Sequence, residues 1–242
     1  MRRALAFALA GAAPLALAVG SAFAPFSAMA PGAALPPGWR ELGVPRAARA
    51  EIALVDDAGA TVLRVRSRAS AGAAALKVRV PLQAQPVLAW RWKVERVVKA
   101  ADLHRREGDD FAARVYVFFD IPEGELPLGA RIKSSLARLL HGEELPTAAL
   151  CYVWDNRHAP GTTAWNPYTD RVRTVVVESG EGRAGEWVEA RRDLEADFRA
   201  AFGAQWRGPV PALTGIAAGN DTDQTGEAAT AWFADFRLEA RK

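Results

Sequence analysis

The stretch GDDFAARVYVFF, residues 108–119, contains the most strand-like segment of this 242-residue chain. From Phe111 to Phe119 both alternating sets of side chains are largely apolar, which is typical of a central strand covered on both faces. The exception is Arg114, which shares a face with Tyr116 and Phe118. We therefore predict a β-strand over Phe111–Phe119 at the centre of a sheet, with one cation on a covered face.

Other strand patterns follow on both sides of this segment. Glu51–Val55 and Thr61–Ser67 flank Asp56-Asp57-Ala58-Gly59, a turn that favours a β-hairpin. Val87–Val94 places two tryptophans on one face and two basic residues on the other. The remaining predicted strands cover residues 76–80, 150–154, 172–178, 187–192, 213–218 and 232–240. In the last of these, even-numbered residues from Trp232 to Leu238 are expected to share one face.

Two segments have helical patterns. Leu128–Leu140 carries one apolar stripe. Leu194–Phe202 follows Asp193, a candidate N-cap, and precedes Gly203, a candidate helix stop. About ten strands that do not alternate with helices predict an all-β fold. We expect an antiparallel β-sandwich of jelly-roll type with two short peripheral helices.

The N-terminus has the pattern of an export signal, with two arginines, a long apolar run and small residues after it. We predict a signal peptide over residues 1–30, whose cleavage site stays open, and the alternative is an uncleaved anchor. Residues 31–47 carry four prolines and are expected to be an extended lead-in to a single β-sandwich domain over 48–242. This organisation predicts an exported protein of the periplasm or cell envelope, with no membrane span in the mature chain.

Composition narrows the classes of function. Half of the residues are apolar and 24% are charged, as in globular proteins. The net charge is +3, and it falls to +1 without Arg2 and Arg3 of the predicted leader. That balance argues against nucleic acid as a partner. The single cysteine, Cys151, lies in an apolar strand pattern and is expected to be a buried small hydrophobe.

Charged residues at the start of the central strand are the first candidates for a site. Asp109 and Asp110 are adjacent, so on a strand they would point to opposite faces and could not form one acid–base pair. Asp110 is expected to share its face with Arg114, and a carboxylate beside a guanidinium can hold hydroxyl groups. We predict ligand-binding roles for all three residues. The alternative is a structural ion pair at a strand end.

Aromatic residues beside amides form a second candidate. Sugar recognition combines an aromatic face, which packs on ring C–H groups, with polar side chains that bind hydroxyls. Trp154 and the loop residues Trp165 and Asn166 are the predicted contributors. Trp165 is expected to be the most exposed of the aromatics because residues 156–171 read as a loop. The alternation around Trp154 is also compatible with a core position.

The stretch GNDTDQTGE, residues 219–227, offers oxygen atoms at alternate positions. That spacing suits a hard cation, so Asp221, Asp223 and Thr225 are predicted metal ligands, with calcium as the candidate ion. An EF-hand is excluded because no helices flank the loop and no glutamate closes it. Asp221 is also a predicted ligand-binding residue. The alternative is a turn in which these side chains cap their own backbone.

Sequence motifs of known catalytic types are absent, and His104, His141 and His158 share no zinc-binding spacing, so each is expected to be a solvated surface residue. We therefore assign no catalytic residue. If the protein were an enzyme, it would use carboxylates alone, and the candidates are Asp110, Asp155 and Asp221.

Several segments together resemble a bacterial family known only as domain of unknown function 3047, over about residues 50–240. They are Trp90–Val94, Gly108–Val117, Cys151–Trp154, Asn166–Tyr168, Asp197-Phe198 with Phe202-Gly203, and Asp221–Gly226. The resemblance implies an exported or periplasmic protein and brings no established activity. Gln224 stands where the family pattern has asparagine. The closing segment Asp235–Glu239 also resembles, more weakly, the last strand of jelly-roll carbohydrate-binding modules.

The interpretation that unites these observations is an exported β-sandwich that binds a glycan or another polyhydroxylated ligand. Two alternatives remain open at this point. One is a glycoside hydrolase or lyase on the same fold, and the other is a structural envelope protein without a small-molecule site. The oligomeric state is not predicted.

Overall fold

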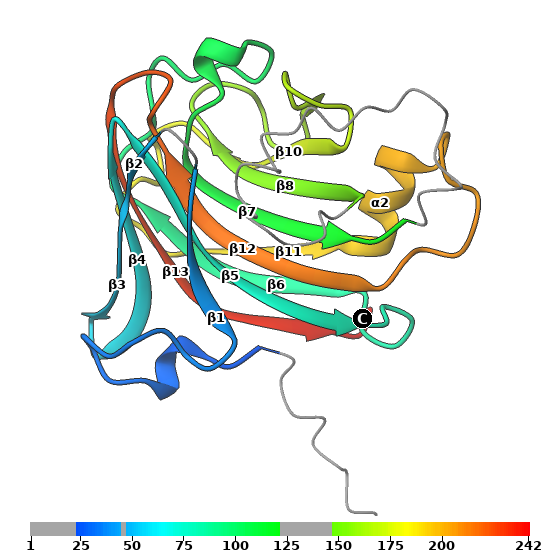
Figure 1. Ribbon diagram of the computed structural model, residues 1–242, viewed down its shortest axis with the longest axis horizontal. Helices are drawn as coiled ribbons and strands as arrows, with labels where there is room; N and C mark the ends of the chain where they lie inside the picture. Colours follow the sequence, from blue (N-terminus) through cyan, green and yellow to red (C-terminus); the bar gives the residue numbers. More distant parts are fainter. Residues whose placement is uncertain (1–22, 45–46, 122–146) are drawn as a thin grey trace, which may run out of the picture.

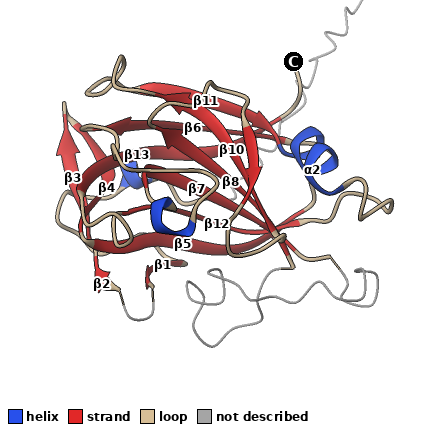
Figure 2. Cartoon of the chain, turned by 90° about the horizontal axis from the view of Figure 1, so that it is seen from above, coloured by secondary structure: helices blue, strands red, loops and turns tan. Residues whose placement is uncertain are grey.

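The computed structural model describes residues 23–44, 47–121 and 147–242, which form two β-sheets packed face to face (Figures 1 and 2). One sheet has eight strands and the other has five. The predicted helix over 128–140, His141 and most of the predicted leader lie outside the described residues. No helix in the described part of the chain has the length and hydropathy needed to cross a bilayer.

The larger sheet is ordered β1-β5-β12-β7-β8-β10-β9, with β2 paired to β5 at one end. Its strands are β1 Trp39–Gly43, β2 Ala48–Arg49, β5 Ser70–Val80, β7 Phe111–Phe119, β8 Ala148–Asp155, β9 Thr163–Trp165, β10 Val172–Ser179 and β12 Leu213–Asp221. The β7 strand lies between β12 and β8, and all nine of its residues are buried. The prediction of a central strand over Phe111–Phe119 is therefore confirmed.

The smaller sheet is ordered β11-β6-β13-β4-β3. Its strands are β3 Glu51–Asp57, β4 Ala60–Arg68, β6 Val87–Val94, β11 Val188–Asp193 and β13 Ala228–Glu239. Two short 3₁₀ turns, η1 Phe26–Ala28 and η2 Arg106–Gly108, and one helix, α2 Leu194–Phe202, complete the described elements. The α2 helix lies at one end of the two sheets (Figure 2).

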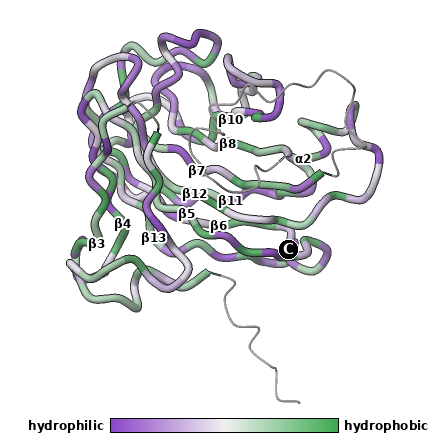
Figure 3. Tube along the Cα trace, viewed as in Figure 1, coloured by the Kyte–Doolittle hydropathy of each residue, from purple (hydrophilic) through white to green (hydrophobic). Residues whose placement is uncertain are grey.

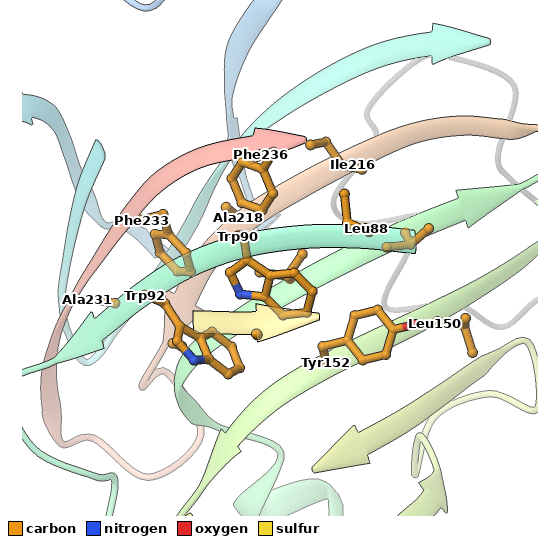
Figure 4. Close-up of a cluster of buried hydrophobic side chains, with 14 of the residues drawn as sticks. Leu88, Trp90, Trp92, Leu150, Tyr152, Ile216, Ala218, Ala231, Phe233 and Phe236 are labelled. Atoms are coloured by element: carbon orange, nitrogen blue, oxygen red, sulfur yellow. The ribbon is translucent and has the colours of Figure 1, made fainter. Parts of the chain in front are cut away.

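Large aromatic side chains fill the space between the sheets (Figure 4). Trp90 and Trp92 of β6 are fully buried, with their ring centroids 5.5 Å apart and nearly perpendicular planes. Trp90 also packs against Tyr152 of β8 at 5.4 Å and against Phe236 of β13 at 6.4 Å. Because buried aromatic residues contribute the largest apolar areas, these contacts across the layers are a main source of the sandwich's stability.

The larger sheet is also covered on its other face. A second apolar cluster there includes Tyr116 and Phe118 of β7, Cys151 and Val153 of β8, and Ala217 of β12. The Cys151 thiol is free and fully buried, and this burial raises its pKa to about 12. The expectation of a buried cysteine in an apolar strand is confirmed. Hydrophobic colour follows the strands, whereas many connecting segments are hydrophilic (Figure 3).

Local predictions agree with the structure where turn and cap chemistry decide the backbone. The β3–β4 hairpin turns at Ala58 and Gly59, which have φ of 57° and 85°. Two successive positive φ values are typical of the type I′ turn that suits a two-residue hairpin. At α2, the Asp193 carboxylate accepts a hydrogen bond from the Ala196 N–H, at 3.0 Å, and Gly203 follows the helix as its C-cap.

The sandwich architecture is confirmed, with differences in strand number and direction. The described residues form 13 strands, more than the predicted ten. Strand β10 runs parallel to β8, because the connection between them crosses over and adds the edge strand β9 inside the predicted loop 156–171. The β13 alternation slips at a bulge between Ala234 and Arg237, so Phe233 and Phe236 both reach the core.

The N-terminal segment of the described chain is built into the sandwich. Within the predicted lead-in, Trp39–Gly43 forms β1 and pairs with β5. Phe26 packs on Trp39 with ring centroids 4.8 Å apart, and both side chains are buried. Ser27 donates hydrogen bonds to the Asp235 carboxylate through its backbone N–H, at 3.2 Å, and its hydroxyl, at 2.6 Å. This segment therefore contributes to the core.

Gly219 of β12 is expected to tolerate no side chain. A Cβ at this position would lie 2.2 Å from the Gly72 carbonyl oxygen and 2.6 Å from the Ala73 Cβ. We expect Gly219→Ala to lower the free energy of unfolding by about 1–3 kcal/mol, as overpacking does. Urea denaturation measures the loss. Gly182→Ala is the matched control, because a Cβ at that position would meet no atom within 4 Å; equal stability losses in both variants would contradict the prediction.

Candidate functional site

A small pocket opens on the outer face of the larger sheet, near the start of β7 and the end of β12. Its volume is about 50 Å³. Small residues of β5 and β12 form one wall, namely Ala71, Gly72, Ala73 and Gly219. Polar and aromatic side chains form the other walls: Asp109, Arg114, Tyr116, Tyr168, Asp221 and Asp223, with Gln224 beside them. The short side chains of the strands make room for the pocket, and the loops supply its polar groups.

Arg114 is the buried cation at the centre of this site, with 4% of its side chain exposed. Its Nε donates to Asp221 Oδ1 at 2.7 Å and its Nη2 pairs with Asp221 Oδ2 at 2.7 Å, a bidentate arrangement. Nη1 donates to the Tyr116 hydroxyl at 3.0 Å, and Nη2 also contacts the Asp109 carbonyl and carboxylate. The guanidinium is therefore held by protein groups and fixes the orientation of Asp221.

Charge balance keeps Arg114 ionised despite its burial. Burial alone would lower the pKa of this guanidinium. The Asp221 carboxylate, followed by Tyr116 and Asp109, outweighs that effect and holds the pKa well above its ordinary value. Conversely, burial raises the pKa of the Tyr116 hydroxyl, so this group remains a neutral hydrogen-bonding partner.

The two adjacent acids diverge as predicted, but the pairing with Arg114 is the reverse of the prediction. Asp109 contacts Arg114 at 3.3 Å and accepts a hydrogen bond from the Asn166 amide at 2.9 Å. Asp110 instead accepts from the backbone N–H groups of Gln224, at 3.1 Å, and Thr225, at 2.6 Å. The prediction was wrong because strand β7 begins only at Phe111. Asp109 follows a 3₁₀ turn, and its own backbone angles are φ −74° and ψ 53°, so strand alternation does not extend to Asp109.

The stretch 219–227 forms both a strand end and a turn. Asp221 is the last residue of β12, and the Gly226 N–H donates to the Thr222 carbonyl at 2.9 Å to close the turn. Gly226 has φ of 75°, which favours glycine. Glu227 then accepts hydrogen bonds from the backbone N–H groups of Lys99, at 3.1 Å, and Ala100, at 2.8 Å. The turn is thereby fixed against two other segments, and Asp223 and Gln224 line the pocket.

Three carboxylates from these segments come together. Asp110, Asp221 and Asp223 each offer an oxygen, and these oxygens lie within 4.8 Å of one another. They are the residues that could hold a metal ion, because carboxylate oxygens are the ligands that calcium prefers. Thr225, a predicted ligand, uses its hydroxyl oxygen to accept from the Glu227 N–H at 3.3 Å. Asp110 takes its place in the described cluster.

Negative charge exceeds positive charge in this site. Burial raises the pKa of Asp221 well above its ordinary value, and the Asp110 and Asp109 carboxylates raise it further against the effect of Arg114. Burial and then Asp110 raise the pKa of Asp223, and burial raises that of Asp109. The site therefore favours groups that relieve this charge, namely a proton, a cation or hydrogen-bond donors such as hydroxyls.

The predicted aromatic residues lie elsewhere. Trp154 has an exposed fraction of 1% and its indole N–H donates to the Gly180 carbonyl at 3.0 Å, so its ring cannot stack on a ligand. Trp165 lies on the edge strand β9, between the Phe202 ring at 5.7 Å and the Arg173 guanidinium at 4.9 Å. Neither residue lines the pocket. The predicted stacking role of Trp154 was therefore wrong, because its ring belongs to the core, and Trp165 lies outside the pocket.

Tyr168 is the half-buried aromatic residue of the pocket. Its hydroxyl donates to the Arg106 carbonyl at 3.1 Å, and the Arg106 guanidinium lies 5.2 Å from the ring centroid. Asn166 joins it to the charged cluster, since its amide oxygen accepts from the Tyr168 N–H at 3.0 Å while its amide nitrogen donates to Asp109. The Asn-Pro-Tyr motif at 166–168 was the sequence signal, although only Asn166 was assigned a role.

Asp155 is separate from the pocket. It is fully buried at the end of β8, and its Oδ1 accepts from the backbone N–H groups of Arg157, at 2.7 Å, and His158, at 2.6 Å. It does not line the pocket, whereas Asp221 does. Among the carboxylates considered for catalysis, only Asp110 and Asp221 belong to one cluster.

A family model described as "Protein of unknown function (DUF3047)" matches residues 37–237. This match confirms the family resemblance deduced from the sequence motifs. None of the curated proteins compared with the chain matches it.

Solved structures with a similar architecture include glucanases and carbohydrate-binding modules. The xyloglucanase domain of NopAA from Sinorhizobium fredii is 9% identical with a TM-score of 0.46, and the match covers 86% of this chain and 96% of that chain. Endoglucanase cel12A from Rhodothermus marinus is 11% identical with a TM-score of 0.45, over 85% and 92%. A family 30 carbohydrate-binding module of Clostridium thermocellum is 12% identical with a TM-score of 0.36, over 92% and 97%. These likenesses concern the β-sandwich and transfer no activity.

Proposed function

The chain belongs to the DUF3047 family, and we propose that it binds a glycan or another polyhydroxylated ligand in the pocket between Asp223, Gln224 and Tyr168. The observation that carries the proposal is the convergence of carboxylates, an amide and a half-buried tyrosine ring on one hollow of the sheet. We further propose that the protein does this after export, at the periplasm or cell envelope, as the N-terminal pattern suggests.

Each wall of the pocket matches one part of a sugar. A hydroxyl group donates one hydrogen bond and accepts others, so carboxylate oxygens and an amide nitrogen are complementary to neighbouring hydroxyls. The apolar C–H face of a sugar ring packs well on an aromatic ring such as that of Tyr168. Arg114 contributes indirectly, because its N–H groups are used by Asp221, Tyr116 and Asp109. It positions Asp221 for the ligand.

The size of the pocket limits what enters it. A volume of about 50 Å³ holds only a few waters, at roughly 10–15 Å³ for each. Pockets that enclose a whole drug-sized ligand are about 300–1,000 Å³. We therefore propose that the pocket receives the hydroxyl-bearing edge of one sugar unit, while the remainder of the ligand stays outside.

Binding is tested by isothermal titration calorimetry after a thermal-shift screen of mono- and oligosaccharides. We expect Asp223→Asn and Tyr168→Ala each to weaken the affinity for the best ligand at least tenfold, since each removes a direct contact. Tyr168→Phe is expected to retain most of the affinity because it keeps the ring. Asp56→Asn, a matched substitution at the exposed end of strand β3, serves as the control. Unchanged affinity in both pocket variants would contradict the proposal.

A glycoside-cleaving activity is a second candidate function, because Asp110 and Asp221 have carboxylate oxygens within 4.8 Å of each other. Retaining glycosidases use two carboxyl groups about 5–5.5 Å apart. The present hydrogen bonds favour binding over cleavage: Asp110 is committed to two backbone N–H groups and Asp221 to Arg114. If the wild-type protein released reducing sugar from an oligosaccharide and Asp221→Asn did not, this result would favour the glycoside-cleaving activity.

Calcium remains part of the proposal as an occupant of the Asp110, Asp221 and Asp223 cluster. A cation would offset the excess negative charge and be held by oxygen ligands. The same thermal-shift series includes calcium and a chelator, since an ion that binds only the folded chain raises its midpoint. A calcium shift that is lost in Asp223→Asn would support this occupant, and no shift would assign the cluster to hydroxyl binding alone.

A further inference from the structure

A second group of side chains with metal-binding chemistry lies outside the pocket, on the loops that follow β6 and β8. We propose that His104 and His158 bind a divalent transition-metal ion, with Asp155 orienting His158. The observation behind this proposal is the contact between the two imidazole rings, whose centroids lie 5.8 Å apart at an angle of 87°. The residues come from segments more than 50 positions apart, so only the fold brings them together.

Asp155 fixes one nitrogen of His158. Its Oδ1 lies 3.1 Å from His158 Nδ1 and 2.6 Å from the His158 backbone nitrogen. An ionised carboxylate can only accept, so Nδ1 is the donor and Nε2 carries the lone pair. This is the arrangement in which an outer carboxylate prepares a histidine to coordinate a metal through its other nitrogen.

The burial of Asp155 supports the same assignment. The residue is fully buried, and in the described part of the chain His158 is the only side chain able to carry positive charge that pairs with it. Its other oxygen, Oδ2, has no hydrogen-bond partner among the described residues. A buried carboxylate requires compensating positive charge. A metal ion on His158 Nε2 would supply that charge through the ring.

Hydrogen bonds and an ion pair already hold the loop that carries His104 against the loop that carries His158. The Asn156 amide donates to the Lys99 carbonyl at 2.8 Å and to the Ala101 carbonyl at 3.0 Å. Asp102 accepts from the His104 backbone N–H at 2.9 Å and pairs with the Arg157 guanidinium at 2.9 Å. These contacts fix the backbone of both loops without using the side-chain ligand atoms of the histidines, so metal binding requires only side-chain rotation.

The geometry suits a borderline metal with nitrogen ligands. With metal–nitrogen bonds of about 2.0–2.1 Å, two imidazoles on one tetrahedral ion have ring centroids roughly 5 Å apart. The observed 5.8 Å differs by less than one ångström, which a rotation of the His104 side chain can supply because that residue is exposed. Imidazole suits Zn²⁺ and Cu²⁺, whereas Ca²⁺ takes oxygen ligands. Two protein ligands leave the other coordination positions to water or another molecule.

Titration of the full chain with Zn²⁺ in excess Ca²⁺ tests the proposal. We expect one Zn²⁺ per chain, with the affinity reduced at least tenfold in His104→Ala and in His158→Ala. Asp155→Asn is expected to reduce it about 10–100-fold, as loss of an outer partner does.

Cu²⁺ provides an independent readout, because its electron paramagnetic resonance spectrum reports nitrogen ligands. We expect a two-nitrogen signature in the wild-type protein and its loss in His104→Ala. Since His104 is exposed, this variant tests the site even if Asp155→Asn does not fold. Wild-type Zn²⁺ affinity in His104→Ala, or displacement of Zn²⁺ by Ca²⁺, would overturn the proposal.

Discussion

Arg114→Met is expected to lower the free energy of unfolding by about 3–5 kcal/mol at neutral pH, as removing one partner of a buried ion pair does. Methionine keeps much of the length of the side chain but not its charge. The Asp221 and Asp109 carboxylates would then remain in the interior of the site without the cation that they contact at 2.7 and 3.3 Å. Urea denaturation followed by tryptophan fluorescence measures the loss.

The pH dependence of this loss identifies its cause. Burial raises the pKa of Asp221 and Asp109 in the folded chain above the value in the unfolded chain. The stability that these two groups contribute by binding protons is therefore complete below the ordinary aspartate pKa, and it is lost as pH rises through the raised folded-state pKa. Removing Arg114 raises both pKa values further. The Arg114→Met loss is therefore expected to be smaller at pH 4 than at pH 7.

A surface arginine gives the matched comparison. Arg66 lies on strand β4, its side chain is 53% exposed, and it pairs with Glu51 at 3.5 Å. Arg66→Met removes this surface cation. Exposed pairs of this kind contribute about 0–1 kcal/mol, so this variant is expected to remain near wild-type stability. If the Arg114→Met loss were the same at both pH values, lost packing rather than uncompensated charge would be its source.

Phe26→Ala is expected to cost about 3–5 kcal/mol of unfolding free energy, the range for deleting a buried phenylalanine ring. Phe26 is 1% exposed and packs on Trp39, at 4.8 Å between centroids, and on Phe236, at 6.4 Å. The cavity would lie where the N-terminal segment meets the last strand of the smaller sheet. Thermal and urea unfolding measure the effect.

Two further variants of the N-terminal segment serve as comparisons for the stability loss in Phe26→Ala. Ser27→Ala removes only a hydroxyl bond to Asp235 and is expected to cost about 1 kcal/mol. A chain that starts at residue 31, directly after the predicted signal peptide, would lack Phe26 and is expected to be at least as unstable as Phe26→Ala. If the shorter chain had the same free energy of unfolding as the full chain, the N-terminal segment would contribute nothing to stability, and the prediction would be wrong.

Strand and turn predictions succeeded where the sequence determines the backbone locally. Phe111–Phe119 and Val87–Val94 have the predicted bounds, because their apolar side chains are needed on buried faces. The hairpin at Ala58–Gly59 and the cap at Asp193 follow from residue chemistry within four positions. Such local features required no knowledge of the neighbouring strands.

The composition of the site was harder to predict, because it depends on where alternation stops. Asp109 and not Asp110 meets Arg114, because a 3₁₀ turn ends at Gly108 and strand β7 begins only at Phe111, so neither acid belongs to the strand. Trp154 was assigned to a ligand although its face points into the core, and a sheet covered on both faces gives the same apolar pattern for both directions. Tyr168 was overlooked because only the crossover from β8 to β10 brings it to the pocket.

The order of the strands has a consequence for how the chain acquires its structure. Strand β12 lies in the interior of the larger sheet, between β5 and β7, and β13 lies in the interior of the smaller sheet, between β6 and β4. Both follow all the other described strands in chain order, with bounds Leu213–Asp221 and Ala228–Glu239. Neither sheet can close before those residues are made, and β5, β7, β6 and β4 present open edges until then. Folding is therefore expected to be slow, because both layers depend on strand pairs that are distant in sequence and are completed by two neighbouring strands.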